Sequence, residues 1–323
     1  MHRKYFLKTI FGASILISMD RFSSINNSIS DTNKTNNTSI RFASFGAIHL
    51  NNTSLEKSTF FWTKIAGMKL RSSSEKIAEF GTETKTLVVV YETAKYPFKK
   101  GYSGLYHVAI HAPNNKAFAN MINRLMVQNY PFSPVDHTMS KSVYLDDPDG
   151  INIEFTLETP ERFKRVVTNG GLRIEDVDGN VKSASDYLNI NEVLEYLEDN
   201  NSAKIIDEDT YIGHLHLYAN NVENSNTFYT KIGFIPFNNF PQFMYSDLGF
   251  GGAYQHRIAL NSWHGINRPL APKEQAGMRY FHINFNSKEK LEQAVKNVSE
   301  YEKKDDGYFV YDTTGNSIFL SNS

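Results

Sequence analysis

Histidine, glutamate and tyrosine are the side chains in this sequence that could do chemistry at a buried site. The chain has 10 histidines and no cysteine, which excludes disulfides, thiolate zinc sites, iron–sulfur clusters and cysteine nucleophiles. Any metal must therefore be held by nitrogen and oxygen ligands. The segment 135–154 gathers His137, Tyr144 and Glu154, and it is the first place to look for proton transfer or metal binding.

The strand expected around Glu154 places this carboxylate opposite an apolar face. Side chains alternate along a strand, so Ile151, Ile153 and Phe155 share one face and Glu154 lies on the other. A carboxylate that is buried without a partner costs several kcal/mol. Either a cation lies beside Glu154, or the strand is exposed to solvent there.

The overall composition is that of a folded protein without a polyanionic partner. Hydrophobic residues make up 40% of the 323 residues, which is enough for a packed core, and the length suggests two domains. Lys and Arg number 34 against 35 Asp and Glu. With no basic excess to neutralise phosphates, nucleic acid is not expected as a partner.

The first twenty residues have the pattern of an export signal. A basic head at 2–8 precedes an apolar stretch at 9–19, which is too short to cross about 30 Å of hydrocarbon, so no stable membrane span is expected. The run at 3–8 is similar to a twin-arginine motif with Lys4 in place of the second arginine. It favours an exported, periplasmic protein, or a cytoplasmic one if the signal does not function. Residues 21–40 are rich in Asn, Ser and Thr, and we expect them to form a disordered tether.

A stretch near residue 50 recurs 167 positions later. His49 corresponds to His216, because 216 − 49 = 167, and the segment 55–65 returns at the same offset as 222–232. A whole strand and the helix after it are repeated together. Duplication is the simplest explanation.

Hydrophobic periodicity divides each half of the chain again. In the first half, helical spacing at 115–128 lies between a strand at 104–110 and two strands around the turn at 147–150, and a similar succession begins at 277. The sequence therefore predicts an α+β fold of four βαβββ modules, paired so that they enclose a metal cleft. Along the chain these are two modules in a domain at 41–160, a charged connector with one short helix at 161–210, and two modules in a domain at 211–323.

Four such modules resemble the vicinal oxygen chelate superfamily, which contains glyoxalases, bleomycin resistance proteins and extradiol dioxygenases. Within it, the chain is similar to the compact, four-module catechol 2,3-dioxygenases. The segment from Val135 to Glu154 matches the extradiol signature at every defined position. The other motifs that carry the similarity are Gly104-Leu105-Tyr106-His107, Gly213-His214-Leu215-His216-Leu217 and Leu260-Asn261-Ser262-Trp263.

The resemblance implies an Fe(II)-dependent extradiol dioxygenase that cleaves the ring of a catechol-like aromatic diol with dioxygen. His107, Glu154 and His214 occupy slots where the superfamily places its metal ligands. Two histidines and one carboxylate form the facial triad of non-heme Fe(II) oxygenases, which leaves positions open for substrate and oxygen. Mn(II) is the alternative metal.

Three further residues are candidates for proton transfer, because ring cleavage needs a base for the diol and an acid that assists O–O cleavage. His137 and Tyr144 hold the histidine and tyrosine slots of the signature, which implies hydrogen bonding to substrate oxygen. His256 lies in the middle of what is usually a three-histidine run in the family, flanked here by Gln255 and Arg257. It is a candidate acid, base or fourth ligand.

The third ligand depends on which modules share a cleft. If the first and second modules pair, the position aligned with His214 is Ala47, because 214 − 167 = 47, and His49 would have to be the ligand. If the second and third modules pair, His107, Glu154 and His214 converge. We favour the second pairing because it accounts for every retained and every lost ligand slot.

Two other functions stay open. A glyoxalase-like isomerase or lyase would use a divalent metal without oxygen, since a fold does not fix a reaction, although such enzymes favour more glutamate ligands. A metal-free module that binds an aromatic ligand would keep its ligand after His107→Ala. A homo-oligomer is compatible with the sequence under each of these functions.

Overall fold

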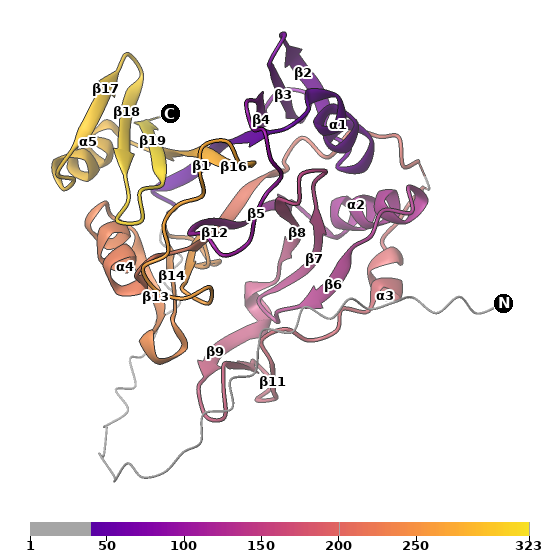
Figure 1. Ribbon diagram of the computed structural model, residues 1–323. Helices are drawn as coiled ribbons and strands as arrows, with labels where there is room; N and C mark the ends of the chain where they lie inside the picture. The colour runs from indigo at the N-terminus through magenta and orange to yellow at the C-terminus, as the bar shows by residue number, and fades with distance from the viewer. Residues whose placement is uncertain (1–39, 200, 323) are drawn as a thin grey trace. The chain divides into compact units, whose positions relative to one another are not determined.

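The computed structural model describes residues 40–199 and 201–322. The expected export signal and all but the last residue of the expected tether lie outside the described residues. In the described part, the strands form two eight-stranded sheets and one three-stranded sheet, with short helices packed on them (Figure 1). No helix in this part of the chain combines the length and the apolar character that crossing a bilayer requires. The fold is mixed α+β, as predicted.

Each large sheet contains two modules that are distant in the sequence. The first sheet has the order β17 (Tyr301–Lys304), β18 (Gly307–Tyr311), β19 (Ser317–Asn322), β16 (Gly277–Phe285), β1 (Ala43–Asn52), β4 (Thr86–Glu92), β3 (Ile77–Gly81) and β2 (Lys69–Ser73). The second has the order β13 (Ile235–Phe240), β14 (Tyr245–Gly249), β15 (Ile258–Asn261), β12 (Tyr211–Tyr218), β5 (Gly104–Ala112), β8 (Asn152–Glu158), β7 (Ser140–Asp146) and β6 (Ser133–Asp136). The first and fourth modules therefore share one sheet, and the second and third share the other.

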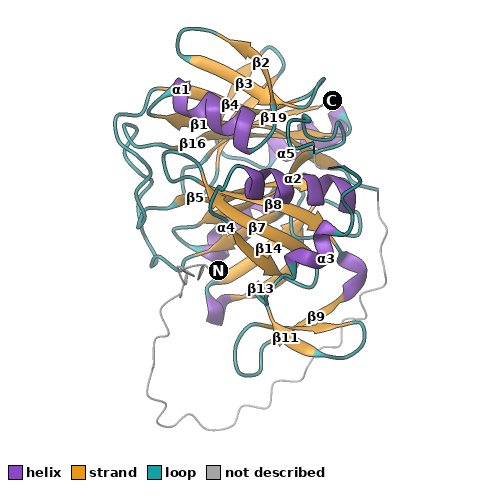
Figure 2. Ribbon diagram, turned by 90° about the vertical axis from the view of Figure 1, so that its right-hand side faces the viewer, coloured by secondary structure: helices purple, strands orange, loops and turns teal. Residues whose placement is uncertain are grey.

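In every module a helix follows the first strand and begins at a polar cap. Ser or Asn side chains accept a hydrogen bond from the first turn of each helix, which satisfies an amide that has no partner within the helix. Figure 2 shows these helices against their sheets. They are α1 (Leu55–Phe60), which continues as a π-helical turn (Phe61–Ile65), α2 (Asn115–Val127), α4 (Val222–Lys231) and α5 (Lys288–Lys296).

Helix α2 buries most of the apolar stripe that its sequence predicts. Phe118, Ile122 and Leu125 are fully buried, and Met121 nearly so. Met126 is different, because it lies in the last turn and is 46% exposed. The buried stripe therefore ends at Leu125, two residues before the helix ends at Val127.

The connector at 161–210 contains more structure than its sequence predicts. The predicted short helix is α3 (Ile190–Leu194), which packs on α2. The connector also forms a three-stranded sheet of β9 (Phe163–Val167), β10 (Arg173–Asp176) and β11 (Val181–Ser183), whose short, charged strands gave no clear periodic signal. Arg124 of α2 is buried and donates hydrogen bonds to the carbonyls of Ser202 and Lys204, which holds the end of the connector.

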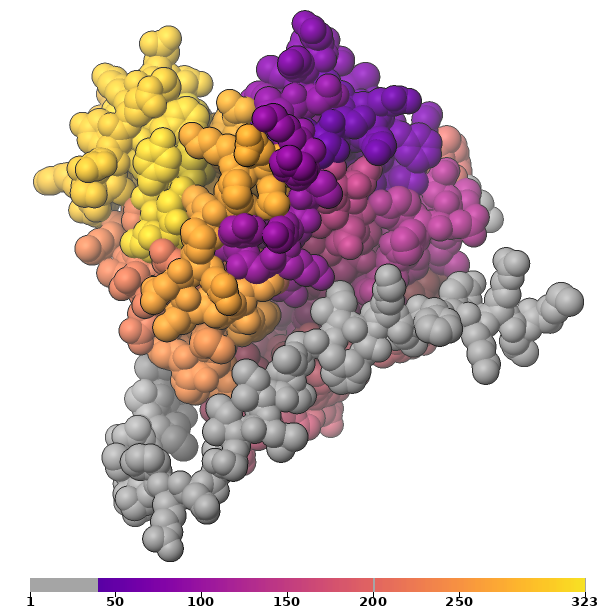
Figure 3. All heavy atoms as spheres, viewed as in Figure 1, coloured from indigo at the N-terminus to yellow at the C-terminus, as the bar shows by residue number. Residues whose placement is uncertain are grey.

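Long loops and turns join the two large sheets. Asn52, the last residue of β1, donates from Nδ2 to Oδ2 of Asp147 over 2.6 Å. In the other half of the chain the Tyr229 hydroxyl donates to Oδ2 of Asp312 over 2.9 Å. The segments 93–103 and 262–276 also run side by side (Figure 3) and are joined by backbone hydrogen bonds.

A histidine in the first sheet gives a pH-dependent stability that can be measured. His49 stacks on Tyr280 with 3.8 Å between ring centroids. Burial, reinforced by His282 and Arg279, lowers the pKa of His49 to about 3 from its usual 6.5. The folded protein keeps His49 neutral while the unfolded chain takes up a proton below pH 6.5. This contribution to stability is therefore present above pH 6.5 and is lost as the pH falls toward about 3.

We expect His49→Phe, which keeps the stacked ring but cannot titrate, to lose less stability on acidification than the wild type does. Urea unfolding at neutral pH and again at mildly acidic pH would measure the free energy of unfolding of both proteins. An equal loss in the two proteins would contradict the assignment.

Candidate metal centre

The sheet register places three predicted ligands on adjacent strands. Ala109 of β5 lies opposite Glu154 of the parallel strand β8 on one side and opposite His214 of the antiparallel strand β12 on the other. His107 is two residues from Ala109 and so points to the same face of β5. Because Ala109 carries only a methyl group, the longer side chains around it can meet above it.

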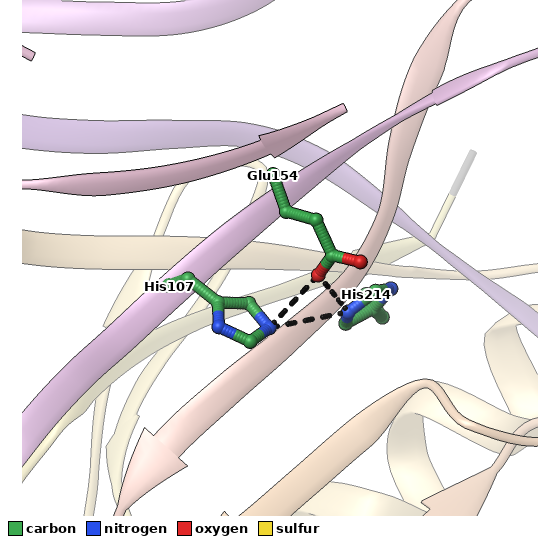
Figure 4. Close-up of side chains that lie close together, drawn as sticks. All are labelled: His107, Glu154 and His214. Carbon is green, nitrogen blue, oxygen red and sulfur yellow. Dashed lines mark hydrogen bonds and ion pairs between the residues drawn. The ribbon is translucent and has the colours of Figure 1, made fainter. Parts of the chain in front are cut away.

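The three side chains meet at a single point (Figure 4). Glu154 Oε2 lies 3.0 Å from His107 Nε2 and 2.9 Å from His214 Nε2, and the two nitrogens are 3.4 Å apart. Ligands held at right angles about 2.1 Å from a divalent ion are about 3.0 Å apart. Among the described residues, no donor forms a well-aligned hydrogen bond to the buried Oε2.

The protonation states of Glu154 and His214 also suit a divalent cation. Burial raises the pKa of Glu154, but the neighbouring His214 and His107 outweigh burial and hold that pKa well below its usual value. Burial lowers the pKa of His214 well below its usual value. Near neutral pH the cluster therefore offers a carboxylate and an unprotonated imidazole, which is the form in which these side chains bind metals.

His137 and Tyr144, the two predicted signature residues, form one hydrogen-bonded unit beside His107. Burial lowers the pKa of His137, so the ring is neutral and carries one proton. Its Nδ1 donates to the carbonyl of Ala184 over 2.6 Å, which leaves Nε2 to accept from the Tyr144 hydroxyl over 2.8 Å. The Tyr144 and His107 rings have centroids 5.4 Å apart. Burial and the charge of Glu154 raise the pKa of Tyr144 well above its usual value, so it is a hydrogen-bond donor.

His256 lies on the other side of the triad and is oriented by a carboxylate. Its ring centroid is 4.8 Å from that of His214. Its Nδ1 donates to Oδ2 of Asp247 over 2.8 Å, and the Tyr245 hydroxyl donates to the same oxygen over 2.9 Å. Asp247 is buried, so the unit is a histidine held in one tautomer by a buried carboxylate.

Among the described residues, the triad is the one group of three or more potential ligands close enough to share an ion. The corresponding positions of the first sheet hold Ala47, Tyr280 and Phe319. His49, the alternative third ligand, lies in that sheet and stacks on Tyr280 instead. The observed pairing therefore brings His214, and not His49, to Glu154.

The profile of the Glyoxalase/Bleomycin resistance protein/Dioxygenase superfamily matches residues 44–155, which span the first two modules. The chain carries a domain of this superfamily. The family resemblance inferred from the sequence motifs is thereby confirmed.

This chain is similar to two kinds of known protein. A protein of Bacillus subtilis (strain 168) named catechol-2,3-dioxygenase is 28% identical over 264 residues, which cover 80% of this chain and 87% of the relative. Solved structures share the fold. A candidate dioxygenase from Bacillus subtilis has a TM-score of 0.54 at 13% identity, covering 86% of this chain and 85% of its own. A glyoxalase I variant from Zea mays has a TM-score of 0.51 at 14% identity, covering 87% and 94%.

Several residues around the triad were missed by sequence reasoning. Asp247 carries no motif and is linked to His256 only by the pairing of β14 and β15. Ala184 acts through its backbone carbonyl, which no side-chain pattern reveals. Glu158 could have been found from the sequence. Side chains at every second position of a strand share a face, so Glu158, four residues after Glu154, was expected on the same face as Glu154.

We expect the purified protein to bind about one divalent ion per chain and Glu154→Ala to abolish that binding. Removing the carboxylate takes away the only negative charge of the triad. His214→Ala should have the same effect, whereas His49→Ala in the first sheet should bind metal like the wild type. Metal analysis after dialysis, with circular dichroism to verify folding, measures this. Binding by Glu154→Ala at the wild-type level would refute the site.

Proposed function

We propose that this protein is an Fe(II)-dependent extradiol dioxygenase that opens the ring of a catechol-like diol. The observation that carries the proposal is the arrangement of the site. A buried triad of two histidines and one glutamate lies between two hydrogen-bonded pairs, His137–Tyr144 and His256–Asp247, that can donate or accept protons. This combination is what a reaction between a diol and dioxygen requires.

Fe(II) held by His107, Glu154 and His214 would supply adjacent positions at which diol and dioxygen react. The other residues manage protons and orientation. His256 takes the diol proton at Nε2, because Asp247 holds its Nδ1–H and stabilises the imidazolium that forms. The Tyr144 hydroxyl, whose proton is donated to His137, accepts from a hydroxyl of the diol and fixes the orientation of the ring. The O–O bond and one C–C bond of the ring break, and both atoms of dioxygen enter the product.

The comparisons support this reaction in coarse terms. A relative that aligns with most of this chain is named a catechol-2,3-dioxygenase, and the superfamily includes dioxygenases. The likeness to glyoxalase I concerns the fold alone. The triad has a single carboxylate, and this donor set favours oxygen chemistry over a glyoxalase-like reaction.

Anaerobic purification with metal analysis, followed by addition of catechol and air, tests the proposal. We expect near-stoichiometric iron, oxygen uptake and a yellow ring-opened product in the ultraviolet–visible spectrum. Bound metal without oxygen uptake across a panel of catechols would overturn the proposal in favour of a glyoxalase-like enzyme. A protein that binds aromatic ligands but no metal would overturn it in favour of a binding module.

We expect His256→Gln to lower kcat by about 10²- to 10⁴-fold while leaving bound iron unchanged, because the residue moves a proton and is not a ligand. Oxygen uptake and iron content are measured on the same sample. Loss of iron in the variant would instead make His256 a fourth ligand. His282→Gln, a change at a histidine of the first sheet, is the matched control and should retain wild-type kcat.

A further inference from the structure

A chain of buried hydrogen bonds extends from the triad into the interior of the second sheet. His214 uses Nε2 toward Glu154, and its other nitrogen, Nδ1, lies 2.7 Å from Nε2 of His111. His111 is fully buried, and its Nδ1 lies 2.9 Å from Oε1 of Glu158. The residues come from three adjacent strands, β12, β5 and β8.

The donor and the acceptor can be assigned in each of these contacts. Burial raises the pKa of Glu158, but its hydrogen bond to His111 and the charges around it hold that pKa well below its usual value, so the group is a carboxylate that can only accept. Oε1 of Glu158 also accepts from the Tyr211 hydroxyl and from Arg257, and His111 Nδ1 donates to the same oxygen. A neutral His214 that offers its Nε2 lone pair to a metal carries its proton on Nδ1, and this proton is donated to His111 Nε2.

A buried arginine locks the far end of the chain. Arg257 donates from one nitrogen to Glu158 over 2.6 Å and to the carbonyl of Gly213 over 3.0 Å. Its guanidinium packs against the rings of Phe250 and Tyr254. Arg257 lies where the extradiol family usually has a histidine. In this chain the arginine at that position is paired with Glu158.

Gly213 makes room for His111. The pairing of β12 with β5 shifts register between Ile212 and His214, and a Cβ built on Gly213 would lie 2.0 Å from the His111 ring. Any other residue here would displace the ring. Gly46, at the corresponding position because 213 − 167 = 46, faces His282 in the first sheet, where a Cβ would lie 2.5 Å from that ring.

We propose that His111 is a positioning residue for the metal ligand His214, held in place by Glu158, Arg257 and the missing side chain of Gly213. Ligating histidines are held in one tautomer by a partner on their second nitrogen. The inference rests on the proposed metal centre and extends it to residues that touch neither metal nor substrate.

Competition between the full-length protein and a chelator for Co(II) tests the inference without using activity. We expect His111→Phe to weaken Co(II) binding by about 10- to 100-fold. His111→Gln should retain most of the affinity, because an amide can both donate to Glu158 and accept from His214. Gly213→Ala should weaken binding like His111→Phe, whereas Gly46→Ala, the same change in the first sheet, should bind like the wild type.

Folded His111→Phe and Gly213→Ala proteins that bind Co(II) as tightly as the wild type would overturn the inference and leave the proposed function standing. A wild-type protein that binds no Co(II) would instead overturn the metal centre itself. If the variants do not fold, ¹⁵N-histidine NMR of the wild type decides the matter. We expect His111 and His214 both to carry the proton on Nδ1, and an Nε2–H tautomer of either ring would refute the inference.

Discussion

A buried carboxylate between two histidine rings is the constraint on which the rest of this structure depends. Glu154 is 1% exposed, and both close contacts of its Oε2 are with histidine nitrogens. Such a group is costly to bury unless a cation accompanies it. The register of three strands, the methyl group of Ala109 between them and the paired hydrogen-bonding units on either side all keep this carboxylate and its two histidines in one arrangement.

The two large sheets show how one frame can be stabilised with or without such a centre. In the first sheet the corresponding region carries aromatic rings, with Tyr280 against Phe309 and Phe309 against Phe319 at centroid distances of 5.1 and 4.9 Å. These three rings line an open cavity together with the charged residues 303–306. His49 stacks there as a neutral ring. The two sheets therefore share one arrangement of strands, and among the described residues only the second sheet carries the triad.

Sequence alone predicted the four modules and the residues of the triad, because the repeat offset and the strand alternation are local signals. The pairing of the second and third modules followed from which ligand slots had been lost. The contacts of His111 could not be predicted in the same way. They join residues 47 and 103 positions apart and depend on a register shift at Gly213, which no periodicity reveals. The sheet of the connector and the exposure of Met126 are likewise set by tertiary packing.

The sheet order also bears on how the order of modules along a chain can change in evolution. Phe285 of β16 pairs with Ala43 on one side and with Asn322 on the other. The beginning of the first module and the end of the fourth are therefore two strand spacings apart, about 10 Å. A short link between them and a break in the connector would give a circular permutant with the third module first. Both large sheets would keep every strand neighbour, so the arrangement of the triad depends on which strands meet and not on the order of the modules along the chain.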